Sequence, residues 1–118
     1  MYFDVWFITK YHRKVLVGEV DACEKNAFAE IAERKGFDIL EHETDEDHVH
    51  MLLRVKKGDR LSAMMRVIKS VSAKKVMASI PHLRVGKGNF WAPRYKWRKV
   101  PARQLDVVRE YIRNQKKY

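Results

Sequence analysis

Runs of apolar, aromatic and β-branched residues along the chain predict four strands. Residues 2–9 are aromatic and β-branched, which is typical of a strand. Residues 37–43 read as extended, and residues 48–55 follow them across the acidic stretch 43–47, which we expect to form a hairpin turn. Residues 90–99 predict a fourth strand, whose start Pro93 places at an edge or a bulge.

A helical period of apolar residues predicts three helices between and after these strands. The first covers residues 19–35 and stops at Gly36. The second opens at Gly58-Asp59, with Asp59 as a candidate N-cap, and Pro81 ends it. Pro101 suits the first turn of a last helix over about 102–116.

The order of these elements determines the expected fold. Strand, helix, strand, strand, helix, strand is the ferredoxin-like split βαβ order, an α+β sandwich with a four-stranded antiparallel sheet and helices on one face. The strand at 48–55 would then be central, and the last helix would remain to be packed. We expect one domain over residues 1–118, because no repeat or low-complexity tract divides the chain.

Composition narrows the functional classes. The chain has 118 residues with 25 Lys and Arg against 15 Asp and Glu, a formal net charge of +10. Such an excess favours nucleic acid as a partner, although a basic surface, a ribosomal role or a membrane-surface role also fits the charge. The one cysteine, Cys23, excludes an internal disulfide, and no apolar run approaches the roughly 18 residues of a membrane span. We therefore expect a cytoplasmic protein.

Two histidines, His48 and His50, stand one residue apart in the strand at 48–55. Side chains alternate between the faces of a strand, so both imidazoles point to the same side while Val49 and Met51 point to the other. Two adjacent imidazoles form half of a metal site. Taken alone, the pair is also compatible with ordinary surface or core histidines, which are more common.

The last helix offers groups that would complete such a site. Leu105, Val108 and Ile112 form an apolar stripe, and Tyr111 and Gln115, four residues apart, share a face beside it. If the stripe docks on the sheet face that carries the histidines, Tyr111 and Gln115 lie at the rim of that contact and can face them. Gln115 has an amide oxygen suited to a third ligand, and the phenol of Tyr111 is a candidate nucleophile. A tyrosine in this position could equally serve packing.

These groups together imply a phosphoryl-transfer mechanism. A divalent cation held by His48, His50 and Gln115 would polarise a phosphodiester, and Tyr111 would attack it to form a phosphotyrosine bond. Three neutral ligands would leave the positive charge of the cation undiminished.

Basic and aromatic residues elsewhere are candidate DNA contacts. Stacking on unpaired bases is expected of three aromatic residues, for which packing or a dimer interface is an equal alternative: Trp91, Tyr95 and Trp97. Phosphate contacts are expected of seven basic residues, for which a solvated surface is the alternative: Lys10, Arg13, Lys14, Arg66, Lys69, Lys74 and Lys75. Arg94 and Lys96 are also expected to bind DNA.

Several stretches together resemble a known family. They are Thr9 to Leu16, Asp47 to Leu53, Ile68 to Ser72, Pro81 to Leu83, Phe90-Trp91, and Tyr111-Ile112 with Gln115. In these the chain resembles the HUH single-tyrosine transposases (TnpA) of small insertion sequences, named for a His-hydrophobic-His motif. The resemblance covers nearly the whole chain.

The resemblance implies a metal-dependent endonuclease and strand transferase acting on single-stranded DNA. Such proteins recognise imperfect hairpins near the element ends, join through a 5′-phosphotyrosine and work as homodimers, in which the tyrosine helix of one subunit often completes the site of the other. By matching position, His48, His50 and Gln115 would be ligands of Mg²⁺ or Mn²⁺, and Tyr111 the nucleophile.

One stretch departs from the family. After Tyr95 many relatives carry a strand rich in glycine and valine, whereas this chain has the basic, aromatic segment from Lys96 to Pro101. Three alternative functions stay open: a domesticated relative that processes chromosomal repeats, a non-catalytic single-stranded nucleic-acid-binding module of ferredoxin-like fold, and a basic structural or dimerisation protein.

Overall fold

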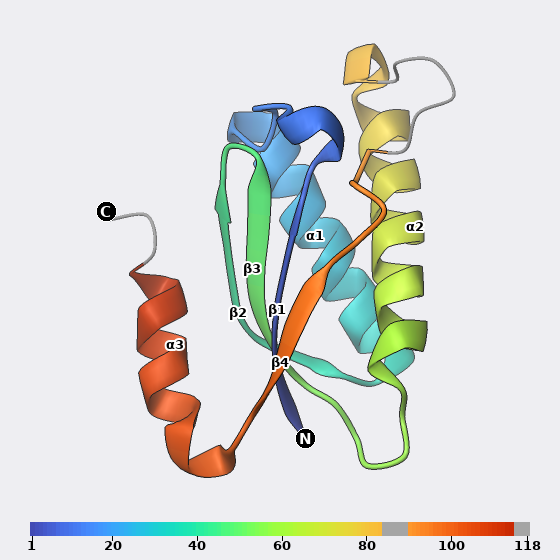
Figure 1. The fold of residues 1–118 in the computed structure, drawn as a ribbon. Coiled ribbons are helices and arrows are strands. Elements are labelled where there is room, and N and C mark those ends of the chain that lie inside the picture. The colour runs from blue at the N-terminus through green and yellow to red at the C-terminus, as the bar shows by residue number, and fades with distance from the viewer. Residues whose placement is uncertain (84–89, 115–118) are drawn as a thin grey trace.

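The fold is an antiparallel sheet with helices on both faces. A computed structural model describes residues 1–83 and 90–114 of the chain (Figure 1). The strands are β1 (Tyr2–Ile8), β2 (Asp38–Asp45), β3 (His48–Arg54) and β4 (Lys96–Val100), and the α-helices are α1 (Gly18–Lys35), α2 (Leu61–Ser79) and α3 (Leu105–Arg113). Short 3-10 turns cover Lys10–His12, Pro81–Leu83 and Ala102–Gln104.

The sheet has the strand order β2-β3-β1-β4, and every neighbouring pair is antiparallel. This is the order that the ferredoxin-like split βαβ arrangement produces, so the expected fold class is confirmed. Strand β3, which carries the two histidines, lies between β1 and β2, as predicted, and β4 is an edge strand.

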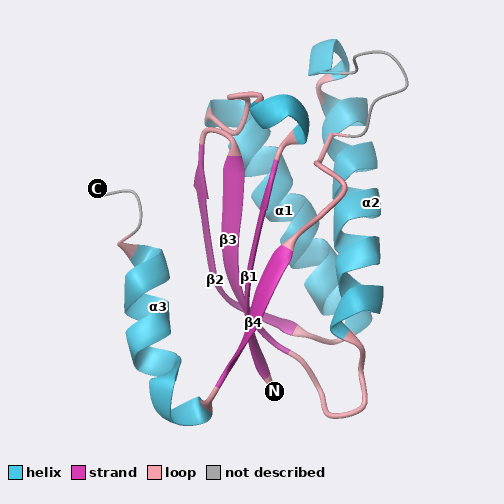
Figure 2. Cartoon of the chain, in the orientation of Figure 1, coloured by secondary structure: helices cyan, strands magenta, loops and turns pink. Residues whose placement is uncertain are grey.

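Successive side chains of β1 and β3 point to opposite faces of the sheet, so one face forms the core and the other carries the histidines. Phe3, Val5 and Phe7 of β1 and Met51 and Leu53 of β3 are buried against α1 and α2. The intervening residues of both strands face the other way, where α3 packs on the sheet through a separate apolar cluster (Figures 1 and 2). That cluster joins Leu52 of β3 to Val108 and Ile112 of α3, so the apolar stripe of the last helix docks on the histidine face.

Several element boundaries differ from the sequence prediction. Helix α2 begins at Leu61 with Arg60 as its N-cap, so Asp59 does not cap it. Strand β4 begins only at Lys96, because Phe90 and Trp91 are buried in the core and Trp91 makes an isolated bridge to Thr9. Strand β2 runs on to Asp45, which shortens the hairpin turn to the residues between Asp45 and His48.

The last helix is shorter than the range predicted for it. Its first turn, Ala102–Gln104, is a 3-10 turn, and α3 follows from Leu105 to Arg113. The end of the predicted helix, including Gln115, lies outside the described residues. In the described part of the chain, no helix has the length and apolar character needed to span a membrane.

Candidate active site

The two histidines lie side by side on the open face of the sheet. Across the β1–β3 pair, His48 stands opposite Ile8 and His50 stands opposite Trp6. The His50 side chain is almost completely buried, and the Trp6 ring meets it edge-on at a centroid distance of 5.8 Å. Both imidazoles therefore project from an inner strand of the sheet.

Each histidine has a carboxylate on one ring nitrogen. His48 Nδ1 donates to Asp47 Oδ1 at 3.1 Å, and His50 Nε2 donates to Asp4 Oδ1 across the sheet. The hydrogen bond from His48 holds the pKa of the Asp47 carboxyl below its ordinary value, with a further contribution from His12. A carboxylate on the outer nitrogen is the usual support of a metal-binding histidine, because it fixes the ring and raises its basicity.

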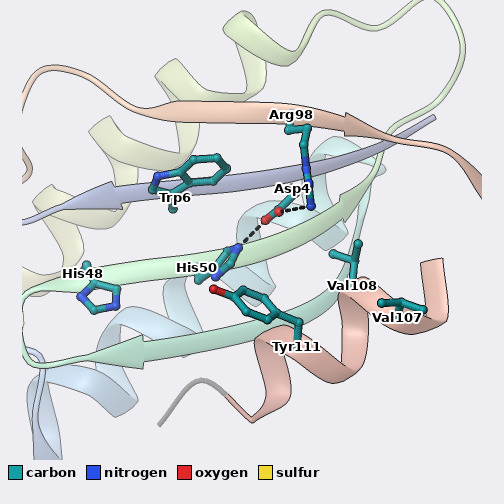
Figure 3. Close-up of a pocket in the computed structure, with 8 residues that line it drawn as sticks. All are labelled: Asp4, Trp6, His48, His50, Arg98, Val107, Val108 and Tyr111. Carbon is teal, nitrogen blue, oxygen red and sulfur yellow. Dashed lines mark hydrogen bonds and ion pairs between the residues drawn. The ribbon is translucent and has the colours of Figure 1, made fainter. Parts of the chain in front are cut away.

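Tyr111 reaches the same place from α3. Its ring centroid lies 6.0 Å from that of His50, with the two planes at 75°. Figure 3 shows the hydroxyl end of the tyrosine pointing toward His50. The side chain is 66% exposed, so the hydroxyl is accessible to a large substrate while the ring stays beside the histidine.

Two ion pairs tie α3 to the sheet at this position. Arg109 Nε donates to Glu41 Oε1 at 3.1 Å, and Arg113 Nε donates to the same oxygen at 3.2 Å. Burial alone would raise the pKa of Glu41, but the hydrogen bonds from Arg113 and Arg109 lower it overall. Since Glu41 belongs to β2, these contacts join the helix that carries Tyr111 to the strand beside the histidines.

The histidines and the tyrosine line one cavity of about 700 Å³ (Figure 3). Trp6, Val107 and Val108 form apolar walls of the cavity, and Asp4 and Arg98 add opposite charges. An apolar wall beside cationic and imidazole groups suits a nucleotide, whose base is flat and apolar and whose phosphate is anionic.

The described residues fit two ligands of a divalent cation. His48 and His50 supply imidazole nitrogens on one face, each with its carboxylate partner. Among residues 1–83 and 90–114, no cluster of three or more His, Cys, Asp or Glu side chains could hold a metal ion by itself. The third ligand expected from the sequence, Gln115, lies outside the described residues.

Sequence reasoning missed Asp4, Trp6 and Arg98. Asp4 is a carboxylate in the middle of an otherwise apolar strand, and that signal was available in the sequence. Trp6 shares its face because the two residues are two apart. Arg98 joins them only through the register of β4 against β1, which pairs it with Asp4.

The expected DNA contacts lie in three places. Arg66, Lys69 and Lys74 of α2 line a second cavity of about 740 Å³, together with Tyr95 from the segment that leads into β4. Lys10, Arg13 and Lys14 follow β1 around the 3-10 turn Lys10–His12. Arg94, Lys96 and Trp97 are exposed at the start of β4, where Lys96 faces the histidine side because it pairs with Trp6.

Several of these expected contacts are engaged within the protein, among them Arg13, whose guanidinium donates to the Leu83 carbonyl at 3.4 Å. Trp91 is 2% exposed, packs edge-on against Phe7 and donates its indole N–H to Ser72 Oγ at 2.9 Å, which is the packing role that the sequence left open as the alternative to base stacking. Lys69 Nζ donates to the Ala92 carbonyl at 2.5 Å, and burial lowers the pKa of its ammonium. Lys69 therefore anchors the segment before β4.

The chain belongs to the IS200-like transposases, since the pattern of that family matches residues 1–115. It is 30% identical over 113 residues to the ISDra2 transposase TnpA of Deinococcus radiodurans, covering 94% of this chain and 80% of that protein. It is 27% identical over 115 residues to the transposase for insertion sequence element IS200 of Salmonella typhimurium, covering 96% of this chain and 75% of that protein.

Solved structures share the fold. A Deinococcus radiodurans R1 protein, described as a candidate transposase, superposes with a TM-score of 0.80 at 29% identity over 98% of this chain and 90% of that one. A REP-associated tyrosine transposase bound to a REP hairpin superposes with a TM-score of 0.73 over 97% of this chain and 65% of that one. The second pair is 18% identical, so this likeness bears on the fold alone.

Proposed function

We propose that this transposase cuts and rejoins single-stranded DNA at hairpin-bearing ends of an insertion sequence, through a 5′-phosphotyrosine on Tyr111. The observation that carries the proposal is the convergence of Tyr111, His48 and His50 on one cavity, although they come from two elements far apart in the sequence. A phenol, two imidazoles and an open cavity are what a covalent phosphoryl transfer requires.

The proposed step is an in-line displacement at phosphorus. The Tyr111 oxygen forms a bond to phosphorus and loses its proton, the bond from phosphorus to the 3′ oxygen breaks, and a 3′-hydroxyl leaves. A second 3′-hydroxyl then attacks the phosphotyrosine, which restores a phosphodiester and returns the phenol. The energy of the first linkage is conserved in the tyrosine bond, so rejoining needs no nucleotide cofactor.

We infer that His48, His50 and Gln115 hold Mg²⁺ or Mn²⁺. When bound, the cation supplies a positive charge for the non-bridging oxygens of the scissile phosphate. The carboxylates on His48 and His50 support this assignment, because they orient the two rings as metal-binding histidines usually are.

The net charge of the chain and its similarity to known transposases support a proposed substrate and a proposed assembly. The net charge of +10 suits a nucleic acid, and so does the second cavity, which Arg66, Lys69, Lys74 and Tyr95 line and which we call the basic groove. The REP-associated transposase of similar fold is described as bound to a hairpin. We propose that Arg66, Lys74 and Tyr95 contact hairpin DNA in that groove. A homodimer is part of the proposal, on the resemblance to the HUH family, and light scattering of the purified protein tests it.

A cleavage assay tests the function. The protein is incubated with labelled single-stranded hairpin DNA and Mn²⁺, and the products are separated on a denaturing gel. We expect a covalent protein–DNA adduct that is absent with a chelator and is lost in Tyr111→Phe and His48→Ala. Tyr11→Phe, which alters an exposed tyrosine outside the cavity, and His82→Ala, an exposed histidine, are the matched controls and keep the adduct.

Specific hairpin binding without cleavage, with every divalent cation tried, would favour the non-catalytic binding module instead. An adduct that persists in Tyr111→Phe would remove the tyrosine from the mechanism.

A further inference from the structure

Asp4 is a charged group in a place that normally excludes charge. It is 4% exposed, in the middle of β1 among aromatic and β-branched residues. Burying a carboxylate is strongly unfavourable unless partners satisfy both oxygens. The partners of Asp4 therefore indicate why the chain keeps a carboxylate here.

Both carboxylate oxygens are engaged by groups of the cavity. Oδ1 accepts from His50 Nε2 on β3, and Oδ2 accepts from Arg98 Nη2 on β4 at 3.1 Å. Figure 3 shows the three side chains in a row across the sheet, with Asp4 in the middle. The Arg98 side chain is 59% exposed, so the row runs from the exposed edge strand β4 to the buried His50.

Asp4 does not count as a further ligand beside the histidines. Within the described part of the chain, His48, His50 and Asp4 do not form a cluster able to hold a metal ion. Instead, the carboxylate lies on the ring of His50 and engages its Nε2. An ion held by His50 would then take the other ring nitrogen, Nδ1.

We propose that Asp4 is a positioning residue, which holds His50 in the Nε2–H tautomer and so presents Nδ1 to the cation, while Arg98 holds Asp4. This inference rests on the proposed metal-dependent function. A carboxylate in this relation to a metal-binding histidine fixes its tautomer and its orientation. Removing such a partner typically weakens metal binding by about 10- to 100-fold.

Asp4→Asn is the direct test, because it keeps the size of the side chain and removes its charge. Binding of Mn²⁺ to the whole protein is measured by the loss of the free-ion EPR signal. We expect Asp4→Asn to weaken Mn²⁺ binding by about 10- to 100-fold and to raise the Mn²⁺ concentration for half-maximal adduct formation in parallel. At saturating Mn²⁺ the adduct should form again, whereas His50→Ala should not recover.

The sheet offers a matched control. Asp38 on β2 makes the same kind of ion pair with Arg54, exposed and away from the cavity. Asp38→Asn should leave Mn²⁺ binding unchanged. Unchanged Mn²⁺ affinity in Asp4→Asn would overturn the proposal. If Asp4→Asn fails to fold, Arg98→Met, which removes the outer member of the row from an exposed site, should still weaken binding, and no effect of it would count against the proposal.

A second readout needs no metal. At alkaline pH, where imidazole is neutral, long-range ¹H–¹⁵N NMR distinguishes the two tautomers of His50. We expect the Nε2–H form in the unaltered protein and a shift toward a mixture in Asp4→Asn, and an unchanged tautomer would contradict the proposal. If the unaltered protein forms no adduct with any hairpin, the proposed function fails, while the tautomer still decides the role of Asp4.

Discussion

At the scale of single residues, Trp91 lies between the sheet and α2. Its ring meets Phe7 and Phe90 edge-on at centroid distances of 4.9 and 4.7 Å, and its indole N–H donates to Ser72. Trp97 has the same side chain on the edge strand, where it is 55% exposed and touches Phe3 edge-on at 5.8 Å. Of these two tryptophans, Trp91 therefore belongs to the hydrophobic core and Trp97 to the surface of the edge strand.

We expect Trp91→Ala to lower the free energy of unfolding by about 3–5 kcal/mol, because it empties a large buried volume and leaves Ser72 without its donor. Trp97→Ala should cost about 1 kcal/mol, since most of that ring is already in water. Urea unfolding followed by circular dichroism measures both. Equal losses would contradict the assignment of Trp91 to the core.

The basic residues of α2 also differ, because some of them bond within the protein and others are exposed to solvent. Lys69 donates to the Ala92 and Arg94 carbonyls, whereas Arg66 and Lys74 are exposed in the groove. Lys69→Met should lower the melting temperature, because the carbonyl of Ala92 loses its donor. Arg66→Ala and Lys74→Ala should leave the melting temperature unchanged and each reduce the salt dependence of DNA binding by a slope of about 1. Unchanged salt slopes in both would remove the groove from the DNA interface.

At the scale of elements, the docking of α3 decides whether the nucleophile meets the histidines. Its apolar stripe packs on Leu52, and its two arginines share Glu41 on β2. Above the ordinary carboxyl pKa of 4.5, Glu41 is charged whether or not α3 is docked. Because docking lowers the pKa of Glu41, the ion pairs stabilise the docked helix fully at neutral pH and are lost as the pH falls through the lowered value.

Glu41→Gln should therefore loosen α3 at neutral pH. Because the ion pairs of Glu41 are partly exposed and each contributes little, hydrogen exchange of the α3 amides should accelerate by only about 5-fold. The unaltered protein should show the same acceleration only in acid, after the intrinsic pH dependence of exchange is divided out, and the variant should show no further change there. Glu33→Gln, an exposed carboxyl on α1, is the control. Equal α3 protection in both variants at neutral pH would argue against Glu41 as an anchor.

The elements themselves were largely predictable, because their signals are local. Aromatic, β-branched and other apolar residues mark β1 and β3, and the helical period marks α1 and α2. The errors fall where tertiary contacts override local preference. Asp59 has the chemistry of an N-cap, yet the helix starts after Arg60, and the aromatic residues Phe90 and Trp91 are taken by the core instead of by β4.

At the scale of the whole molecule, the site arises where β1, β3 and α3 meet. The histidine pair and Tyr111 could be predicted because each belongs to a short periodic pattern. Asp4 and Arg98 could not be joined to them from sequence, because their contacts depend on the registers of β3 and β4 against β1. The candidate DNA contacts were harder to predict, because the local sequence does not indicate whether a basic or aromatic side chain is exposed or buried.

In the proposed mechanism, Tyr111 forms the covalent bond to the DNA. The adduct formed with single-stranded hairpin DNA and Mn²⁺ is digested with nuclease and trypsin, and the peptides are analysed by mass spectrometry. Cleavage after Arg109 and Arg113 releases a short peptide with Tyr111 as its only tyrosine. We predict a nucleotide phosphate on that residue. A nucleotide on another tyrosine, such as Tyr11 or Tyr95, or on no tyrosine at all, would contradict the role of Tyr111 as the nucleophile.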